Sequence, residues 1–111
     1  MTGQEGERLA LEYLQAKGYS LVQSNFRTRF GEIDIIVKNG EYLVFAEVKT
    51  RKNSRFALGA EAVDARKRRK LILTASGYLA LHATRLQPRF DVIEVYAQTG
   101  RINHIIGAFT G

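Results

Sequence analysis

Two runs of apolar residues separated by a short polar turn give the clearest structural signal along the chain. The first run is GEIDIIVK at residues 31–38, and the second is EYLVFAEVKTR at residues 41–51. Both contain many β-branched or aromatic residues and alternate in part with polar ones, as strands do. Asn39-Gly40 lies between the runs and is the dipeptide most typical of a two-residue type I′ turn. The pattern therefore predicts a β-hairpin with Asp34 opposite Phe45.

The remaining hydrophobic and polar positions predict two helices and three further strands. Thr2 and Glu5 have the spacing of a capping box for a helix over residues 3–17, and Gly18 is placed to end it. Apolar positions predict a long second helix over residues 61–82. Short strands are expected over residues 19–25, 89–97 and 101–109. The resulting order α-β-β-β-α-β-β makes residues 1–111 a single α/β domain, with a central mixed sheet flanked by helices.

Composition excludes several functional classes. The 111 residues are 45% hydrophobic and 25% charged, which is ordinary for a globular domain. No cysteine is present, which excludes a disulfide framework, a thiolate nucleophile, a zinc finger and an iron–sulfur cluster. Charged residues interrupt the N-terminal segment, and no segment approaches about 18 consecutive apolar residues, so no signal peptide or membrane span is expected. The expected location is the cytoplasm.

Positive charge is concentrated in one segment. The whole chain carries a formal charge of +6. The segment from Lys49 to Lys70 contains nine basic and two acidic residues, a local charge of +7, and the rest of the chain carries −1. A local basic patch suits a polyanionic partner such as nucleic acid. Phe56 is the one aromatic residue in this segment, so phosphate contact is favoured over base stacking. A solvated helix face with an exposed loop is the alternative interpretation.

Charged residues of the hairpin share one predicted face. Because side chains alternate along a strand, Asp34, Glu47 and Lys49 emerge together, with Glu32 beside them. Asp34 and Glu47 are then diagonal neighbours at roughly 7 to 8 Å between Cα atoms, near enough for their carboxylates to converge on one ion. The residues expected on the other face are Ile33, Ile35, Val44, Ala46 and Val48. A register shift by an even number of residues would keep the shared face, whereas an odd shift would destroy it.

This carboxylate group is suited to a hard divalent cation. Carboxylates that are buried together need a compensating cation, and Lys49 supplies one positive charge only. Magnesium is typically held by one or two carboxylates together with waters and substrate phosphate oxygens. A structural salt-bridge cluster on an exposed sheet face is the alternative. The apolar residues Ile36, Leu43 and Phe45 flank the charged ones and favour a face that is covered by another element.

Glu7 is a further carboxylate in an unexpected position. On a helical wheel it lies within the apolar stripe that includes Ala10 and Leu14, which should face the core. A carboxylate in that position needs a partner. Glu7 is expected either to pair with Arg27 or Arg29 or to point toward the metal site.

The order of these motifs resembles a known protein family. Asp34, followed after thirteen residues by Glu47 in EVKTR, resembles the Asp…Glu-x-Lys signature of the restriction-endonuclease-like superfamily, including archaeal-type Holliday-junction resolvases. More closely, the chain resembles the YraN family of small bacterial predicted endonucleases over nearly its whole length. The matching stretches are GERLALEYL, GYSLVQSNFRTRFGEIDII, FAEVKTR, EAVDARKRRKL, RFDVIEV and HIIGAF. The resemblance implies a restriction-endonuclease-like fold and a metal-dependent endonuclease.

Site roles follow from that resemblance residue by residue. Asp34 and Glu47 would bind Mg²⁺ or Mn²⁺, together with the Val48 carbonyl and Glu7, directly or through water. Lys49 would orient the attacking water and stabilise charge on the phosphate. The basic residues expected to hold phosphates are Arg27, Arg29, Arg51, Lys52, Arg55, Arg66, Lys67, Arg68, Arg69 and Lys70.

The expected activity is hydrolysis of phosphodiester bonds in DNA, selective for branched or single-stranded structures. The first alternative is a non-catalytic nucleic-acid-binding module that retains the nuclease fold. The second is an interaction protein whose basic helix docks an acidic protein. A homodimer paired through the hairpin or the last strands across a two-fold axis is also compatible with the sequence.

Overall fold

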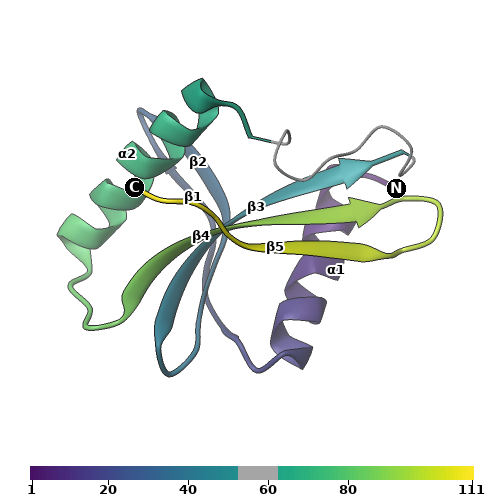
Figure 1. Cartoon of the computed structure of the whole chain (residues 1–111), viewed down its shortest axis with the longest axis horizontal. Helices are drawn as coiled ribbons and strands as arrows, with labels where there is room; N and C mark the ends of the chain where they lie inside the picture. The colour runs from purple at the N-terminus through teal and green to yellow at the C-terminus, as the bar shows by residue number, and fades with distance from the viewer. Residues whose placement is uncertain (53–62) are drawn as a thin grey trace.

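The computed structural model of the chain describes residues 1–52 and 63–111, and these form two helices and a five-stranded sheet (Figure 1). The elements in chain order are α1 (Gly3–Ala16), β1 (Ser20–Thr28), β2 (Gly31–Lys38), β3 (Tyr42–Arg51), α2 (Ala65–Leu81), β4 (Gln87–Tyr96) and β5 (Ile102–Phe109). This order confirms the predicted α/β architecture with its central mixed sheet. Among the described residues, no helix has the length and apolar character needed to cross a membrane.

The sheet is mixed because one of its connections contains a helix. Its strands lie in the order β1-β2-β3-β4-β5. Consecutive strands joined by short turns pair antiparallel, whereas β3 and β4 pair parallel, because α2 lies in the connection between them. The parallel pairing runs from Tyr42–Gln87 to Arg51–Tyr96, so the whole length of β3 is supported by β4.

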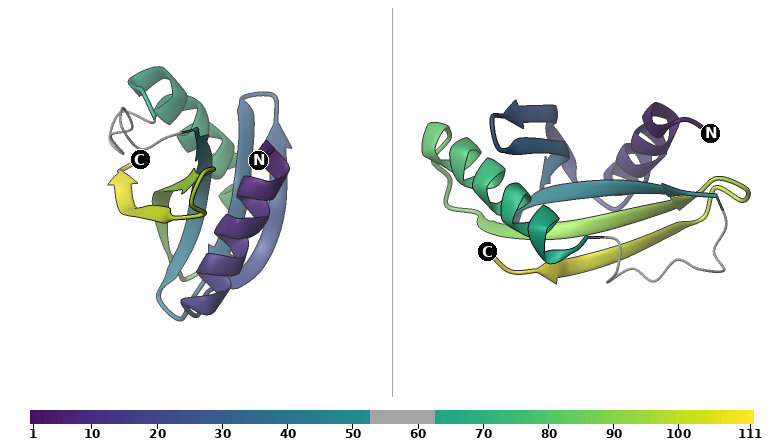
Figure 2. Two further views of the ribbon diagram at one scale, coloured as in Figure 1. Left: turned by 90° about the vertical axis from the view of Figure 1, so that its right-hand side faces the viewer. Right: turned by 90° about the horizontal axis from the view of Figure 1, so that it is seen from above.

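The two helices cover opposite faces of the sheet, as Figure 2 shows. On the α2 side, Leu71, Ala75 and Tyr78 of the helix pack on a buried cluster that includes Ile36 and Phe45. The predicted cover over the face of Ile36, Leu43 and Phe45 is therefore confirmed. The buried cluster on the α1 side consists of Ala10, Leu14, Ile35, Val37, Val44, Ala46, Ile93 and Val95.

Both helices begin at polar caps. The predicted capping box is present, because the Thr2 side chain accepts a hydrogen bond from the Glu5 amide at 3.1 Å and the Glu5 side chain accepts from the Thr2 amide. Helix α2 begins at Ala65, later than predicted. Asp64 adopts an extended conformation and its side chain accepts from the Lys67 amide at 2.8 Å, which makes it the N-cap. The predicted helix start at Glu61 lies outside the described residues.

The hairpin between β2 and β3 has a longer loop than predicted. Ile36, and not Asp34, lies opposite Phe45, so the pairing is shifted by two residues from that of a two-residue turn. The side chain of Asn39 accepts hydrogen bonds from the amides of Glu41 at 2.9 Å and Tyr42 at 2.7 Å, and this stabilises the wider loop. Because the shift is even, residues 35–38 and 43–46 of this ladder keep their predicted faces.

Two strand assignments depart from the prediction. Ile33 was expected on the side of Ile35, but it packs in the cluster on the α2 side, against which Phe26 is also packed. Strand β1 extends to Thr28 and is longer than the predicted residues 19–25. Its pairing with β2 is irregular between Leu21 and Gln23, at a distance from Ile33. Nearer to Ile33, Asn25 lies between the residues that pair with Ile35 and Ile33, and it has a φ of 52°.

Candidate metal centre and nucleic-acid interface

The candidate site forms where β2 leaves β3. The ladder between these strands runs from the pair Lys38–Leu43 to the pair Ile35–Ala46. Beyond it, the backbone amide of Val48 donates to Oδ2 of Asp34 at 2.8 Å. The side chain of Asp34 therefore takes the place that a backbone carbonyl would have in a continuing ladder.

A cavity of about 230 Å³ lies between the diverging strands and α2. Its lining residues are Phe30, Gly31, Glu32, Asp34, Glu47, Lys67, Lys70 and Leu71. The structure thus brings the two predicted metal-binding carboxylates, Asp34 and Glu47, to one cavity. It also places two lysines of the basic segment in the cavity wall.

Negative charge accumulates around Asp34. Burial, together with the nearby carboxylates of Glu47, Glu7 and Glu32, raises the pKa of the Asp34 carboxyl from 3.8 to about 7, while the hydrogen bond from the Val48 amide opposes this rise. A carboxyl with this pKa gains a proton readily near neutral pH. A bound cation would relieve the same repulsion.

Two lysines from different elements neutralise Glu47. The side chain of Glu47 is 6% exposed, and its Oε1 atom lies 3.6 Å from Nζ of Lys49 and 3.1 Å from Nζ of Lys67. Lys49 comes from the same strand, two residues away, whereas Lys67 reaches over from the first turn of α2. The predicted proximity of Lys49 and Glu47 is therefore observed. Lys67, which was expected to contact phosphate, pairs with Glu47 here.

Glu7 lies near this cluster but has its own partner. Its side chain is half-buried, and Nδ2 of Asn25 donates to its Oε1 at 3.2 Å. Asn25 has a φ of 52°, which is uncommon outside glycine but more accessible to asparagine than to most residues. One expected partner of Glu7 was Arg27. This expectation is wrong, because Arg27 forms an ion pair with Glu32 instead.

The donor set fits a divalent ion of the magnesium type. Within residues 1–52 and 63–111, no three His, Asp or Glu side chains are grouped closely enough to form a preassembled metal cage. Mg²⁺ needs no such cage, because it keeps several waters and is commonly held by one or two carboxylates and substrate phosphate oxygens. Asp34 and Glu47 line one cavity and their charges repel each other. They would hold such an ion.

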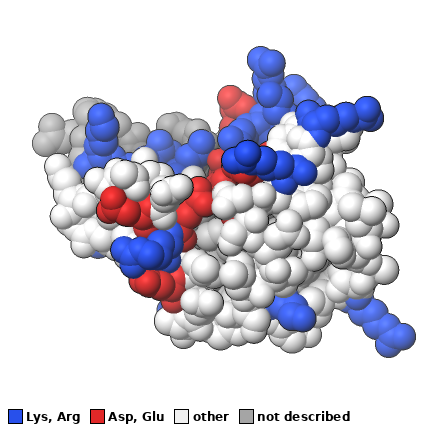
Figure 3. Space-filling view, turned by 180° about the vertical axis from the view of Figure 1, so that it is seen from behind, with Lys and Arg blue, Asp and Glu red and all other residues white. Residues whose placement is uncertain are grey.

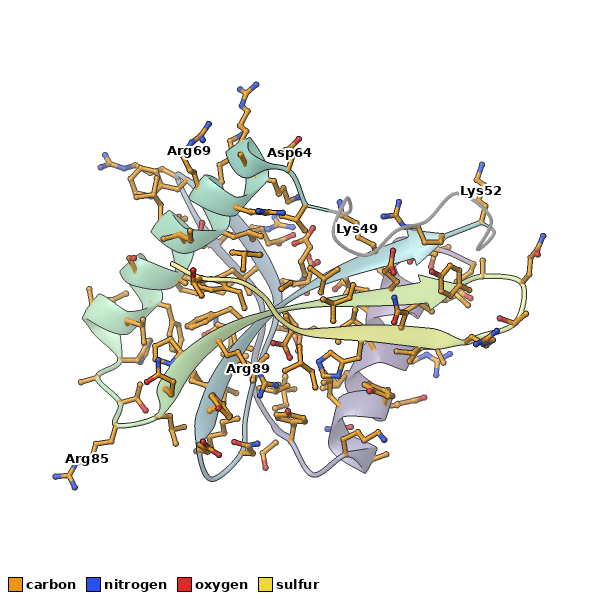
Figure 4. The ribbon with its side chains drawn as sticks, in the orientation of Figure 1. Lys49, Lys52, Asp64, Arg69, Arg85 and Arg89 are labelled. Carbon is orange, nitrogen blue, oxygen red and sulfur yellow. The ribbon has the colours of Figure 1, made fainter. Side chains whose placement is uncertain are left out.

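Basic and acidic side chains lie next to one another on the face of the molecule that Figure 3 shows. The exposed members of the predicted phosphate-binding group in α2 and at the end of β3 are Lys52, Arg66, Arg69 and Lys70. In Figure 4, Arg69 extends outward from α2 and Lys52 outward from the end of β3. These side chains are available to a large anionic partner.

Other predicted phosphate-binding residues have protein partners. The guanidinium of Arg29 lies 4.8 Å from the ring centre of Phe30. Arg51 donates to buried Glu94 at 3.2 Å, and Arg68 donates to the Val63 carbonyl at 2.9 Å. Arg55 lies outside the described residues. The observed contacts therefore leave these arginines beside the site, with part of their hydrogen-bonding capacity used by the protein.

Sequence reasoning missed the contribution of α2 to the cavity wall. Leu71 is buried against the sheet, and Lys67 precedes it by four residues, so both lie on one helix face. This spacing could have placed Lys67 near Glu47. Phe30 was also missed, and its position next to Gly31 at the β1–β2 turn was the available signal.

A second polar cluster lies on the α1 side of the sheet. Buried Asp91 accepts hydrogen bonds from Arg89 at 2.8 and 2.9 Å and from the Gly107 amide at 3.0 Å, and it contacts Nε2 of His104 at 2.6 Å. Burial alone would raise the pKa of Asp91, but the hydrogen bonds from His104 and Arg89 lower it overall. These contacts satisfy the buried carboxylate and tie β4 to β5.

Sequence comparisons agree with the motifs. The profile of the uncharacterised protein family UPF0102 matches residues 6–95, a range that includes the whole candidate site. A UPF0102 protein of Clostridioides difficile is 45% identical over 108 residues, covering 96% of this chain and 95% of that protein. A UPF0102 protein of Thermodesulfovibrio yellowstonii is 43% identical over 107 residues, covering 96% and 94%. The chain therefore belongs to the uncharacterised protein family UPF0102, also called the YraN family.

Proposed function

We propose that the protein is a metal-dependent endonuclease that hydrolyses phosphodiester bonds in DNA, with selectivity for branched or single-stranded structures. One observation carries this proposal: the carboxylates of Asp34 and Glu47 share a cavity with Lys67 and Lys70. Carboxylates bind divalent metal ions and ammonium groups bind phosphate, and hydrolysis of a phosphodiester uses both. The partner is DNA or another nucleic acid in the cytoplasm, and the homodimer remains a prediction.

The metal would be Mg²⁺ or Mn²⁺, held by Asp34 and Glu47. The Val48 carbonyl and Glu7 remain the predicted additional ligands, directly or through water. An ion in this position supplies a bound water of lowered pKa and neutralises the phosphoryl oxygens. The hydrogen bond from the Val48 amide holds the Asp34 carboxylate at the cavity before any ligand arrives. This fixed position reduces the reorganisation that ligand binding requires.

Lys49 is assigned a positioning and electrostatic role. Its ammonium group lies 3.6 Å from Glu47, and its side chain is 32% exposed, so it is accessible from solvent while tied to the carboxylate. Figure 4 shows Lys49 on β3 close to the N-terminal end of α2. A fixed positive charge here stabilises the negative charge that develops on a phosphate during hydrolysis.

The exposed basic residues would hold the nucleic-acid backbone. Arg66 and Arg69 lie on α2 and are exposed, and Lys52 lies at the end of β3. Contacts of lysine and arginine with phosphate fix the register of a nucleic acid without reading its sequence. Selectivity would therefore depend on the shape of the substrate, such as a junction, a flap or a transition to single strand.

The test is cleavage of a panel of labelled DNA substrates in Mg²⁺ or Mn²⁺. The panel contains a four-way junction, a flap, a single strand and a plain duplex. Glu47→Gln and Lys49→Ala are expected to reduce the cleavage rate by about 100-fold or more, as loss of transition-state charge stabilisation does. Glu12→Gln and Lys38→Ala are matched controls on the exposed surface and should cut like wild type. Absence of cleavage across the panel, or full activity of the two site variants, would refute the proposal.

A non-catalytic nucleic-acid-binding module is the second candidate function. It is favoured by the observation that Lys49 and Lys67 both form ion pairs with Glu47. In that case, binding of DNA should be salt-dependent and should survive Asp34→Ala. Reversal of the charges at residues 66–70 should abolish it. Anisotropy titrations of labelled DNA at several salt concentrations separate this function from the nuclease.

A further inference from the structure

The ion pair between Lys67 and Glu47 joins the basic helix to the candidate metal site. Nζ of Lys67 lies 3.1 Å from Oε1 of Glu47, closer than Nζ of Lys49 at 3.6 Å to the same oxygen. The Glu47 side chain is almost fully buried, whereas 44% of the Lys67 side chain is exposed. Lys67 therefore spans from the helix surface to a buried carboxylate.

The backbone of Lys67 is fixed, whereas nearly half of its side chain is exposed to solvent. Its amide donates to the N-cap Asp64 at 2.8 Å, and Leu71, one helical turn later, is buried against the sheet. These contacts hold the first turn of α2 over the cavity. A lysine side chain has four carbons and rotatable bonds, so its ammonium group can change partners without moving the helix.

Charge balance at the cavity changes when a divalent ion arrives. Ionised Asp34 and Glu47 carry two negative charges, and Lys49 and Lys67 carry two positive ones. A divalent ion would leave these four groups with two excess positive charges, and it would compete with both lysines for the Glu47 carboxylate. Like charges at such separations repel strongly in a partly buried site. Lys67 is the more exposed of the two lysines, so it is the one expected to leave.

We propose that Lys67 is an exchangeable counter-ion, which holds Glu47 in the metal-free protein and releases it to a divalent ion in order to bind a phosphate group of the nucleic acid. The phosphate half of this inference rests on the proposed function, and the competition between Lys67 and the ion does not. Because the released ammonium group then favours phosphate, metal and nucleic acid bind cooperatively, and by linkage each raises the affinity for the other. Lys67 is thus a positioning residue that couples the two ligands.

Mn²⁺ binding to the full chain without nucleic acid tests the competition. Lys67→Met removes the ammonium group that competes with the ion for Glu47. It should therefore raise the Mn²⁺ affinity about tenfold, measured by calorimetry or by electron paramagnetic resonance of free Mn²⁺. Arg69→Met is the matched control, because it also removes one positive charge from α2, but Arg69 is exposed and does not line the cavity. It should change the Mn²⁺ affinity less than about twofold. An equal or weaker Mn²⁺ affinity in Lys67→Met would overturn the proposal.

A second measurement tests the coupling itself. The anisotropy of a labelled, cleavage-resistant phosphorothioate strand is titrated with and without Mn²⁺. In wild type, Mn²⁺ should raise the affinity for the strand about tenfold or more, and in Lys67→Met this factor should fall to about two. Arg69→Met should bind the strand more weakly but keep the full Mn²⁺ effect, and Lys67→Arg should restore part of it. Equal Mn²⁺ factors in wild type and Lys67→Met would contradict the coupling.

The outcomes separate this inference from the proposed function. A wild-type protein that cuts DNA, with a Lys67→Met variant that binds Mn²⁺ no more tightly, refutes the exchange and leaves the nuclease intact. A wild-type protein that binds Mn²⁺ but cuts no DNA refutes the nuclease, and tighter Mn²⁺ binding by Lys67→Met then still supports the exchange. Circular dichroism and thermal unfolding of each variant establish that the fold is retained. Lys67→Gln repeats the test with a polar side chain of similar length.

Discussion

Asp34 and Val48 form a hydrogen bond between a side-chain carboxylate and a backbone amide, 2.8 Å long, at the point where two neighbouring strands part. The bond fixes the carboxylate on β2 relative to the backbone of β3, the strand that also carries Glu47. Asp34 nevertheless lines the cavity, so the group is both anchored and accessible. In this position the Asp34 carboxyl lies near the carboxylates of Glu47, Glu7 and Glu32.

The burial of Asp34 near other carboxylates predicts that the stability of the protein depends on pH. Burial and the charge of Glu47 raise the pKa of Asp34 in the folded protein to about 7, compared with 3.8 in the unfolded chain. The unfolded state therefore binds fewer protons at this group between the two values, and the stability contributed by protonated Asp34 is lost as pH rises through that window. Asp34→Asn cannot ionise and retains a side-chain oxygen for the Val48 amide. It should unfold at a higher temperature than wild type above neutral pH.

Thermal unfolding of wild type and Asp34→Asn, followed in a chelator between about pH 4 and pH 8, provides the measurement. The advantage of the variant should grow through this range and level off above about pH 7. Glu41→Gln, at an exposed position in the β2–β3 loop, is the control and should show no comparable trend. A constant difference between Asp34→Asn and wild type across the range would contradict the raised pKa.

The same pKa predicts how divalent ions should stabilise the protein. A ligand that binds only the folded state at 100 times its dissociation constant stabilises it by about 2.7 kcal/mol. Mg²⁺ must displace the proton from Asp34, so its stabilising effect should be larger above about pH 7 than below it. Thermal unfolding with Mg²⁺ or with a chelator measures the difference. Asp34→Asn and Glu47→Gln should both lose most of the Mg²⁺ effect, and an unaltered effect in both would place the ion elsewhere.

The meeting of Asp34 and Glu47 at one cavity could be predicted from the sequence, because side chains alternate between the two faces along the β2–β3 ladder, although Ile33 departs from this alternation. The Asn39-Gly40 dipeptide suggested the wrong loop length, since the Asn39 side chain caps a wider turn through Glu41 and Tyr42. The resulting shift of two residues is even, so the paired residues kept their faces, and Asp34 and Glu47 line the same cavity. A prediction based on periodicity therefore survived an error in the turn.

Contacts between distant elements could not be predicted in the same way. Whether Lys67 contacts a phosphate or Glu47 depends on where α2 docks, and this is decided by the packing of Leu71 on the sheet. Likewise, Glu7 accepts a hydrogen bond from Asn25 of β1, whereas its charge had suggested an arginine as the partner. Local patterns specify elements and faces, whereas partners across elements depend on tertiary packing.

Nucleic-acid binding should depend on a small number of exposed charges. Arg66 and Arg69 are exposed on α2, and each phosphate contact that is lost should lower the slope of log affinity against log salt by about 0.9 on duplex DNA and about 0.7 on a single strand. Arg66→Gln and Arg69→Gln should therefore weaken binding at low salt without changing the preference for DNA shape. Arg85→Gln is the control, because Arg85 extends from the opposite end of the molecule in Figure 4. Titrations at several salt concentrations measure the slopes, and equal slopes for all three variants would place the interface on another surface.

The close approach of α1 to β3 predicts opposite effects of alanine at two glycines of one helix. A Cβ atom at Gly6 would lie 2.2 Å from the Thr50 hydroxyl oxygen, whereas a Cβ at Gly3 would have no atom within 4 Å. Glycine to alanine in a helix is favourable by up to about 1 kcal/mol where space permits, so Gly3→Ala should be neutral or stabilising. Gly6→Ala should destabilise by about 1–3 kcal/mol, as overpacking does.

Urea unfolding of the single and double variants checks this contact. Because the steric conflict is with the Thr50 hydroxyl, Gly6→Ala should be tolerated in a Thr50→Ala background, and the two substitutions should be strongly non-additive. Gly3→Ala should add independently to Thr50→Ala and serves as the control. Gly3→Ala serves as the reference for a helix glycine without this contact.

Glu7 follows Gly6 directly and contributes to the raised pKa of Asp34. A shift of α1 away from β3 in Gly6→Ala should therefore also lower the Asp34 pKa, which a carboxyl-carbon NMR titration measures. If both the stability and the Asp34 pKa were unchanged in Gly6→Ala, the position of α1 would not depend on the contact between Gly6 and Thr50.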